Sequence, residues 1–467
     1  MDKKRINPNK AIAELCKRSF FRFVQEFWHT IIPEEPVYNW HIEYLCDELQ
    51  RYVEQVAQRQ DKDKDCVINI PPGTSKSTIA TIMLPVYAWV IDARIRVLTA
   101  SYSQSLSTDH ALKSRDIVQS DKFKLLFPHI EIKRDQNNKT HYKNNQGGER
   151  FATSVGGTIT GFHAHIIIVD DPLNPKGASS DADRDTANNF MNTTLSTRKV
   201  NKSMTPTILV MQRLHEEDCT GNWLRKGKDI KHICLPGTLS DDVKPKSLRD
   251  RYKDGLLDNV RLTHKDLDEL KLNLGSYGYA GQIMQIPAPS DGGIWQKWLI
   301  PINKSEIPML TNVGTDWDTA YTEKDENSAS AYCTAGLSGK NMYITDIGHK
   351  RYEFPRLVSY MTTKHEPHYI EGKASGKSLK QTLVSQGIPA IEVPVIHGDK
   401  VARATMATPF AEAGMIFIDR DLLDYVYNDV DQGILKFPNG AHDDTNDALV
   451  QSIHRLLGKP QIEFFDL

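Results

Sequence analysis

The segment PPGTSKST at residues 71–78 has the residue types of a phosphate-binding loop. Lys76 carries a charge that can reach phosphate oxygens, and the Ser77 hydroxyl is a ligand that suits Mg²⁺. The strict pattern has two glycines, whereas Ile70 and Ser75 stand at those positions. An apolar run precedes the segment and a helical pattern follows it, an arrangement that presents backbone N–H groups to a phosphate. We predict a phosphate site made by Gly73, Thr74, Ser75, Lys76, Ser77 and Thr78.

Two acids end a second apolar run, in HIIIVDDP at residues 165–172. Asp170 would hold a Mg²⁺ ion, and Asp171 would polarise an attacking water molecule. The alternative is that the pair only caps a helix or a turn. Because Lys76 follows another apolar run, we expect the two acids and the lysine to meet at one edge of a sheet.

Other polar residues extend this predicted site. Gln212 and Arg213 follow the apolar run at 207–211, where a side chain can sense the terminal phosphate. Trp40 and His41 supply an aromatic ring and a polar group that would flank an adenine, although core packing explains Trp40 equally well. Ser101, after the run RVLTA, is a further candidate for relaying the nucleotide state.

The second half of the chain has acids at predicted strand and helix ends. Converging carboxylates repel one another unless divalent metal ions lie among them. Two such ions about 3.5–4 Å apart hold a phosphodiester and activate water, as in RNase H-like nucleases. Each acid alone is more often a surface charge or a helix cap. The predicted metal ligands are Asp316, Glu371, Asp443, Asp444 and Asp447, and weaker candidates are Asp318, Asp346 and His442.

The elements that must position these residues form two α/β patterns. Short apolar runs at 67–70, 96–100, 165–169 and 207–211 alternate with helical patterns at 76–92 and 103–120, which is typical of a mostly parallel sheet. A second pattern has strands at 368–371, 389–394 and 415–418 and a helix from Asp444. Between the two, a charged segment has a predicted helix near 264–284. The predicted domains are residues 1–235, a bridge at 236–305, and residues 306–467.

Composition excludes several classes of protein. The formal net charge of −2 gives no global basic field, so any contact with DNA needs a local basic groove. The six cysteines are scattered and form no C-x-x-C pair, which argues against a zinc ribbon or a disulfide framework. No apolar stretch has the length of a membrane span, and the charged N-terminus is unlike a signal peptide. We expect a soluble intracellular protein without a membrane partner.

With these motifs in order, the chain resembles the large terminase subunit of tailed bacteriophages, the ATP-driven motor and nuclease that packages and cuts viral DNA. The resemblance extends from about Val37 to the helix after Asp447. It rests on PP-x-x-x-K-S-T, GTITGFHAHIIIVDDPLN, MQRLHEEDCTG, AGQIMQIPAPSDGGIW, IEGKASGKSL and FPNGAHDDTNDAL. Three departures stand out: Ser75 replaces a loop glycine, Phe162 replaces an arginine, and Asp171 replaces a glutamate.

The resemblance implies an α/β architecture with an ASCE P-loop NTPase domain followed by an RNase H-like nuclease domain. It implies ATP and Mg²⁺ as cofactors, with Mn²⁺ as an alternative in the nuclease. Implied partners are double-stranded DNA, a portal protein and a small terminase subunit, in a homo-oligomeric ring on the procapsid within the host cytoplasm. With the family's arginine absent at Phe162, Arg213 and Arg198 are the substitutes for an arginine finger.

Two other interpretations stay open at this point. One is a helicase-like translocase whose second domain is only a structural RNase H-like module. The other is a DNA-binding scaffold with decayed sites, which the presence of Lys76 and Asp170 opposes.

Overall fold

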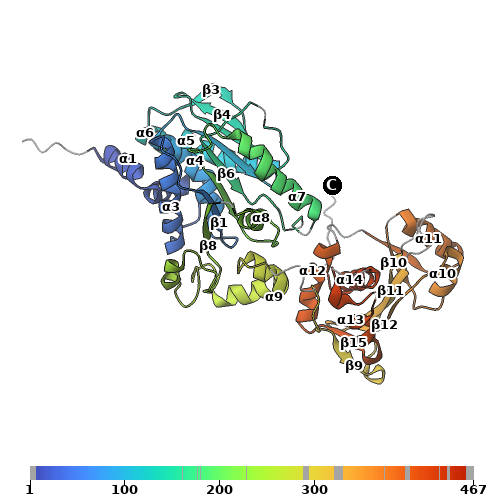
Figure 1. The fold of residues 1–467 in the computed structure, drawn as a ribbon. Coiled ribbons are helices and arrows are strands. Elements are labelled where there is room, and N and C mark those ends of the chain that lie inside the picture. The colour runs from blue at the N-terminus through green and yellow to red at the C-terminus, as the bar shows by residue number, and fades with distance from the viewer. Residues whose placement is uncertain are drawn as a thin grey trace, which may run out of the picture. The chain divides into compact units, whose positions relative to one another are not determined.

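The computed structural model describes residues 7–159, 161–175, 177–178, 180–227, 229–287, 294–319, 330–372, 374–394, 400–430, 432–438 and 442–458. The chain forms two compact units (Figure 1). The first comprises Met1–Glu269 and Gly278–Ala288, and the second comprises Leu270–Tyr277 and Pro289–Leu467. Within the described residues, no helix is long and apolar enough to cross a membrane.

The first unit contains an eight-stranded sheet with the strand order β3-β4-β5-β2-β6-β7-β1-β8. All neighbours from β5 to β8 in this order pair in parallel, and β3 and β4 pair antiparallel at one edge. The strands are β1 (Asp65–Asn69), β2 (Arg96–Ser101), β3 (Ile132–Asn137), β4 (His141–Asn144), β5 (Glu149–Ser154), β6 (Ile166–Asp170), β7 (Thr207–Met211) and β8 (Ile230–Cys234). The mostly parallel sheet predicted from the apolar runs is confirmed.

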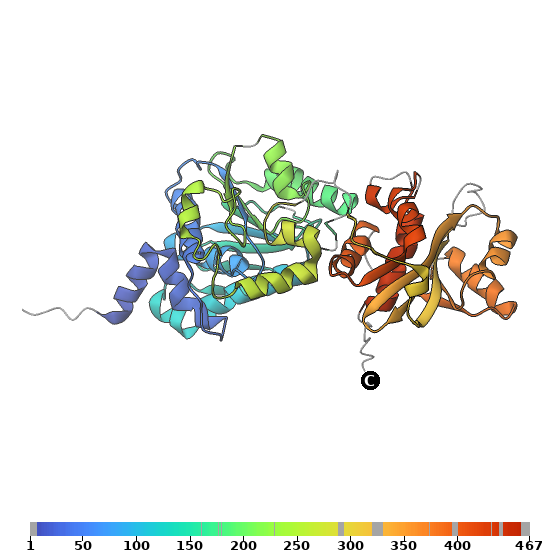
Figure 2. The same ribbon diagram turned by 90° about the horizontal axis from the view of Figure 1, so that it is seen from below.

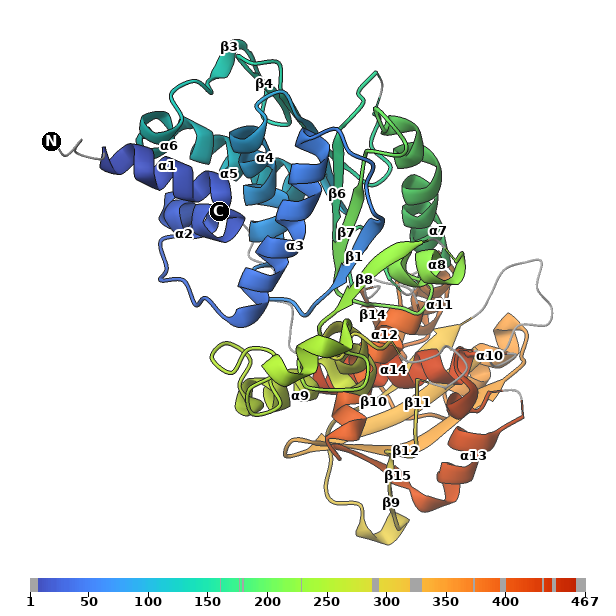
Figure 3. The same ribbon diagram turned by 60° about the vertical axis from the view of Figure 1, so that its left-hand side comes forward.

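Strand β7 lies between β1 and β6, which is the ASCE arrangement of a P-loop fold (Figure 3). Alternate residues of β6 enter two different cores, since Ile166 and Ile168 pack into one and Ile167 and Val169 into the other. The strand is therefore covered by apolar side chains on both faces, as its nearly continuous apolar sequence requires.

The helices from α1 to η5 belong to the first unit, and α9 begins in it and continues through Leu270–Tyr277 of the second unit. Their bounds are α1 (Pro8–Arg18), α2 (Phe20–Phe27), η1 (Trp28–Thr30), α3 (Trp40–Ala57), α4 (Leu84–Ile91), α5 (Gln104–Gln119), α6 (Asp121–Leu126), α7 (Asp181–Asn189), η3 (Phe190–Thr194), η4 (Leu195–Arg198), α8 (Cys219–Arg225), η5 (Lys246–Arg251) and α9 (His264–Gln282). The helix predicted near 264–284 is thus present as α9, interrupted at Gly275, where φ is 65°.

The helix after the phosphate loop differs from the prediction. Residues 76–92 were expected to form one α-helix, but Thr78–Met83 form the π-helix η2 before α4 begins. In a π-helix the backbone N–H bonds to the carbonyl five residues earlier, so some carbonyls lose their usual partner. The Thr81 carbonyl accepts a hydrogen bond from Arg150 Nη2 at 2.9 Å, and the Ile82 carbonyl accepts one from Ser114 Oγ at 2.5 Å. Buried side chains that lie far away in the sequence stabilise this turn.

The second unit has a seven-stranded sheet with the order β14-β13-β10-β11-β12-β15-β9. β10, β11 and β12 form an antiparallel meander, and β13 and β14 continue the sheet in parallel beside β10. This is the strand order of an RNase H-like fold. The strands are β9 (Ile300–Ile302), β10 (Thr311–Thr319), β11 (Ser330–Ser338), β12 (Asn341–Lys350), β13 (His368–Glu371), β14 (Ala390–Val393) and β15 (Ile416–Asp419).

Helices cover both faces of this second sheet (Figure 2). α12 and α14 pack on a core around Ile344 and Ile416, and α10 and α11 pack on a core around Trp317. The bounds are η6 (Lys304–Glu306), α10 (Phe354–Met361), α11 (Ala374–Ser385), α12 (Lys400–Glu412), η7 (Arg420–Leu422), α13 (Leu423–Asn428), η8 (Ile434–Lys436) and α14 (Asp444–Leu457).

Candidate functional site

The phosphate loop connects β1 to the helical turn that begins at Lys76. Gly73 has φ of 76° and Ser75 has φ of 65°, both in the left-handed region. Ser75 therefore adopts the backbone conformation that suits the glycine of the strict pattern, at a cost of about 1 kcal/mol or more for a residue with a Cβ. Thr74 is buried and its hydroxyl donates to the Pro71 carbonyl at 2.8 Å, which closes the loop on itself.

Lys76 meets the second acid of the pair that follows β6. Its Nζ lies 3.0 Å from Asp171 Oδ2 and 3.2 Å from Oδ1, and its side chain is almost fully buried. The Gln212 backbone N–H donates to Asp171 Oδ1 at 3.1 Å, which fixes the carboxylate from the end of β7. The lysine, the acid and the residue after β7 come from three strands and meet at one edge of the sheet, as the sequence predicted.

Asp170 lies beside them, fully buried at the end of β6. Thr81 Oγ1 donates to its Oδ2 at 2.9 Å. Burial raises the pKa of both Asp170 and Asp171, and the Lys76 charge opposes that shift; hydrogen bonds from Ser77 and Thr81 also oppose it at Asp170.

Several buried polar atoms at this edge have no hydrogen-bond partner in the structure. They are Asp170 Oδ1, Ser101 Oγ, His110 Nδ1 and Gln212 Oε1. Ser101 pairs with Asp170 across the β2–β6 ladder, and His110 Nδ1 lies 3.7 Å from Asp170 Oδ2. Unpaired buried polar atoms are costly, so a group of them indicates a place for a polar ligand. The carboxylate and hydroxyl oxygens fit Mg²⁺, and the lysine and the loop N–H groups fit phosphate.

Trp40 and His41 lie at the start of α3, next to the loop. His41 is fully buried, and its Nε2 lies 3.3 Å from the Thr74 carbonyl. Burial, together with the charge of Arg261, lowers the pKa of His41 to about 4, so the ring is neutral. The Trp40 ring packs on Tyr252, with 5.6 Å between ring centroids. In this structure His41 contacts the phosphate loop and Trp40 packs on Tyr252; their role beside an adenine stays a prediction.

Arg213 has a structural task. Its Nε donates to Asp218 Oδ2 at 2.9 Å, and Asp218 caps α8 through its bond to the Gly221 N–H. Because this buried pair occupies the guanidinium, the expectation that Arg213 acts as an arginine finger is not supported by its position. Phe162, at the position of the family's arginine, is buried and stacks on Phe151 with 5.2 Å between centroids.

In the second unit, Asp316 of β10 is fully buried and paired with Arg455 of α14. Arg455 Nη2 lies 2.7 Å and Nε 2.9 Å from Asp316 Oδ2, and Ser452 Oγ donates to the same oxygen at 2.6 Å. Burial raises the pKa of Asp316 while the Arg455 charge opposes the rise. The carboxylate is saturated by protein donors, so it has the surroundings of a structural ion pair.

Three of the other predicted acids, Glu371, Asp443 and Asp447, are bridged by two cations from α12. Arg403 Nη1 lies 3.0 Å from Glu371 Oε1, and its Nη2 lies 3.8 Å from Asp447 Oδ2. Lys400 Nζ lies 3.1 Å from Asp447 Oδ2 and also pairs with Asp443. We call Glu371, Asp443 and Asp447 with these two cations the acid–base cluster.

Asp444 lies at the start of α14 and accepts a hydrogen bond from Gln432 Nε2 at 2.8 Å. Asp346 is held by Lys364 Nζ at 2.7 Å and by the Tyr332 hydroxyl at 3.2 Å, and His442 is exposed. Across the described residues, no group of three or more His, Cys, Asp or Glu side chains is arranged to hold a metal ion. The convergence of bare carboxylates that the sequence predicted is therefore not assembled; cations separate the acids.

Sequence reasoning placed Asp318 among the weaker candidates, but strand geometry brings it toward the cluster. Side chains two positions apart on a strand share a face, so Asp318 lies on the same face as Asp316. In the parallel β10–β13 ladder, Asp316 pairs with Tyr369 and Trp317 with Ile370. Continuing this register by one residue places Asp318 beside Glu371. The signal was present in the sequence as D-x-D at a strand end.

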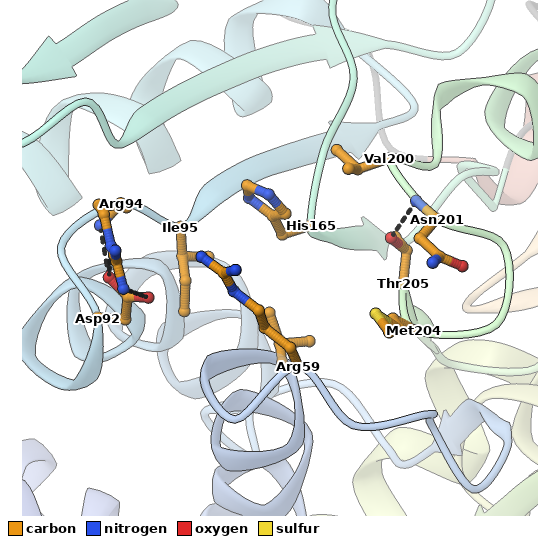
Figure 4. Close-up of a pocket in the computed structure, with 10 residues that line it drawn as sticks. Arg59, Asp92, Arg94, Ile95, His165, Val200, Asn201, Met204 and Thr205 are labelled. Atoms are coloured by element: carbon orange, nitrogen blue, oxygen red, sulfur yellow. Dashed lines mark hydrogen bonds and ion pairs between the residues drawn. The ribbon is translucent and has the colours of Figure 1, made fainter.

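A cavity of about 380 Å³ lies at the other edge of the first sheet, where β2, β6 and β7 begin (Figure 4). Arg59, Arg94 and His165 line it together with apolar side chains such as Ile95 and Val200. No motif in the sequence indicated this cavity. Its residues belong to the opposite ends of the strands from the phosphate loop, so the cavity is separate from the candidate nucleotide site.

No protein-family model and no curated protein matches the chain. Among solved structures, it is similar to the large terminase from a thermophilic bacteriophage, with 12% sequence identity and a TM-score of 0.44 over 88% of this chain and 99% of that chain. The same terminase in complex with ADP covers 80% of this chain and 88% of its own, with 12% identity and a TM-score of 0.41. The large terminase nuclease from thermophilic phage G20c with bound magnesium covers 36% of this chain and 100% of its own, with 13% identity and a TM-score of 0.26. All three belong to the family that the sequence resembles.

Proposed function

We propose that this chain is a viral DNA-packaging motor subunit of the large-terminase kind. It hydrolyses ATP to move double-stranded DNA into a procapsid, and it cuts the DNA with a metal-dependent nuclease at the start and end of packaging. The observation that carries the proposal is the meeting of Lys76, Asp170 and Asp171 at the carboxyl edge of an ASCE sheet. The same chain adds an RNase H-like sheet with acids at its strand ends.

In the motor half, the loop N–H groups and Lys76 hold the phosphates. Lys76 leaves Asp171 for the phosphate oxygens, which frees the Asp171 carboxylate to orient the attacking water and accept its proton. Ser77 and Asp170 are the residues that would hold Mg²⁺, which neutralises phosphate charge when it is bound. Gln212, whose N–H bonds Asp171, links this change to the end of β7.

In the nuclease half, the carboxylates of Asp318, Glu371, Asp443 and Asp447, with Asp444 as a further donor, would hold Mg²⁺ or Mn²⁺ if Lys400 and Arg403 moved away from these acids. Oxygen donors of this charge suit both ions. Such ions, when bound, stabilise the attacking and leaving oxygens of the phosphodiester. Without metal ions, Lys400 and Arg403 compensate the charge of the acids. With the ions bound, both side chains would be released to contact DNA phosphates.

The assembly belongs to the same proposal. The subunit works as a homo-oligomeric ring on the portal protein of the procapsid, with a small terminase subunit that selects the DNA. It acts in the host cytoplasm and joins the procapsid transiently. With a formal net charge of −2, the chain needs a local basic surface for the DNA rather than a global one.

A second function is favoured by one observation. Cations already pair the acids of the second unit, as in the Arg455–Asp316 pair and the acid–base cluster. A P-loop DNA translocase with a purely structural RNase H-like module would have this arrangement without any metal.

The two functions are distinguished by measuring ATP hydrolysis and plasmid cleavage with Mg²⁺ or Mn²⁺ on the same preparations. Lys76→Ala is expected to lower kcat for ATP by at least about 100-fold and to leave cleavage intact. Asp447→Asn is expected to abolish cleavage and to leave ATP hydrolysis intact. Lys64→Ala, which removes an exposed lysine of the first unit, is the matched control for Lys76. ATP hydrolysis without cleavage in the wild type would favour the translocase.

A further inference from the structure

Arg261 contacts the phosphate loop from a segment outside the core sheet. Its Nη1 donates to Ser75 Oγ at 2.9 Å, and its Nη2 lies 3.5 Å from His41 Nε2. The residue comes from the charged stretch after β8, between η5 and α9, where neither spacing nor residue type in the sequence singled it out. All of these residues belong to the first unit.

A buried carboxylate fixes the orientation of Arg261. Its Nε donates to Asp258 Oδ2 at 2.7 Å, and Asp258 itself is fully buried. Asp258 also accepts the backbone N–H groups of Val260 and Arg261, each at 3.1 Å. Burial opposes ionisation of Asp258, but the hydrogen bonds from Arg261 prevail and lower its pKa. The arginine is thus held in one orientation before any ligand is present.

The partner of Arg261 on the loop is the residue directly before Lys76. Backbone N–H groups of such a loop surround the α- and β-phosphates, whereas the lysine reaches the β- and γ-phosphates. Because Arg261 bonds the Ser75 side chain, its guanidinium lies beside the part of the loop that surrounds the α- and β-phosphates. About a quarter of the Arg261 side chain is exposed (23%), so an anion entering the loop can reach it.

We propose that Arg261 binds the α/β-diphosphate of the nucleotide. This assignment rests on the proposed ATP site. In this structure the Arg261 guanidinium donates a hydrogen bond to the neutral Ser75 hydroxyl. A phosphate oxygen is charged and therefore a stronger acceptor for the same N–H groups. When a phosphate oxygen replaces Ser75 Oγ as the acceptor, Arg261 keeps its bond to Asp258 and its side chain keeps its orientation.

A purely structural alternative makes a different prediction. If Arg261 only braced the loop through Ser75 Oγ, removal of that hydroxyl would have the same effect as removal of the arginine. Ser75→Gly removes the hydroxyl and suits the φ of 65° at this position, so the loop keeps its shape. A double-mutant cycle between Arg261→Ala and Ser75→Gly therefore separates the two roles.

The experiment measures Kd for ADP and ATP with Mg²⁺, together with kcat and KM for ATP hydrolysis, on the full-length chain. Arg261→Ala is expected to weaken ADP and ATP binding equally, by roughly 10- to 100-fold, with KM raised and kcat changed less than about threefold. Whatever Ser75→Gly costs alone, Arg261→Ala is expected to weaken ADP binding by the same factor in the Ser75→Gly background as in the wild type. Arg261→Lys, which keeps the charge but loses the planar fork, should fall between. Arg251→Ala, at an exposed arginine ten positions earlier, is the control.

Four outcomes overturn the assignment. If Arg261→Ala binds ADP as tightly as the wild type, Arg261 does not bind the diphosphate, although the proposed ATP site remains supported. A Ser75→Gly variant as weak as Arg261→Ala, with no further loss in the double variant, shows the bracing role instead. Lower kcat with unchanged ADP affinity places the arginine at the γ-phosphate. Absence of nucleotide binding to the wild type overturns the proposed ATP site together with this assignment. Thermal unfolding of each variant confirms that the chain is folded.

Discussion

Asp316 and Asp318 share one face of β10 but have different surroundings. Asp316 is enclosed by Arg455, Ser452 and Gln451, so its charge is compensated entirely within the protein. Asp318 is half-buried and lies one position beyond Trp317, where the β10–β13 ladder ends; extending that register by one residue places it beside Glu371. Asp316 thus has the surroundings of a buried ion pair, and Asp318 is the acid of β10 that the extended register places near the acid–base cluster.

Asparagine substitutions at these two positions should have opposite effects. Asp316→Asn leaves Arg455 buried without its counter-charge, which is expected to cost about 3–5 kcal/mol of folding free energy. Asp318→Asn is expected to cost less than about 1 kcal/mol and to abolish plasmid cleavage. Urea denaturation measures the first effect, and cleavage with Mn²⁺ measures the second. If Asp316→Asn were as stable as the wild type but had lost cleavage, Asp316 would be a metal ligand rather than a structural residue.

Helix α12 supplies both cations of the acid–base cluster. Lys400 and Arg403 are three residues apart, so they lie on one side of the helix, and together they reach Glu371, Asp443 and Asp447. In metal-free protein this helix compensates the negative charge that an ion would otherwise compensate. Binding of a cation to the acids must therefore compete with α12.

Removing the lysine should reveal that competition. Lys400→Met is expected to lower the thermal midpoint of the metal-free protein, because Asp447 loses a partner, and to tighten Mg²⁺ binding by about tenfold. Thermal unfolding with and without Mg²⁺ and titration calorimetry measure both effects. Lys380→Met removes a lysine of the same unit whose partner Glu392 is more exposed (38%) than Asp447 (7%), and should change neither. Equal Mg²⁺ affinity in wild type and Lys400→Met would show that the lysine and the ion do not share the acids.

The elements themselves were largely predictable, and the reasons are local. The runs VINI, HIIIV and TILVM became β1, β6 and β7 because continuous β-branched sequences suit strands buried on both faces. The meeting of Lys76 with Asp171 followed from parallel strands ending at one edge. Pairing of Lys400 with Asp443 joins residues 43 positions apart, and that of Arg261 with Ser75 joins residues 186 apart. No periodicity encodes such contacts, so the sequence placed the acids but not the cations that pair with them.

At the scale of the whole molecule, three buried histidines make the folding stability of the first unit decrease at acidic pH. Burial lowers the pKa of His41, His110 and His232 to about 4 in each case. Since the ordinary pKa is about 6.5, the unfolded chain takes up these protons first as the pH falls. A folded pKa below the unfolded one thus means that stability is present above about pH 6.5 and is lost as the pH falls toward 4.

His232 offers a measurement of this effect at one site. Its Nε2 lies 2.8 Å from Asn69 Oδ1, a contact that a glutamine can keep. Between pH 7 and pH 5 the wild type should lose about 2 kcal/mol more stability than His232→Gln, because the variant has no imidazole to protonate on unfolding. Denaturant unfolding at both pH values, followed through the first unit by hydrogen exchange, measures the difference. Parallel pH dependence in the two proteins would refute a lowered pKa at His232.

The π-helix η2 has a consequence for how this chain tolerates changes in length. A π turn is equivalent to an α-helix that has gained one residue, and in an α-helix each residue turns the axis by about 100°. Deleting one residue of η2 other than Thr78 and Thr81, which belong to the candidate nucleotide site, would restore α geometry there. The same deletion in α4 would rotate the later side chains of that helix by about 100° and disrupt their packing, because Leu84, Pro85, Val86, Tyr87, Ala88, Trp89 and Val90 are all buried. The chain therefore already accommodates one extra residue directly after the phosphate loop, where Arg150 and Ser114 bond the carbonyls of Thr81 and Ile82.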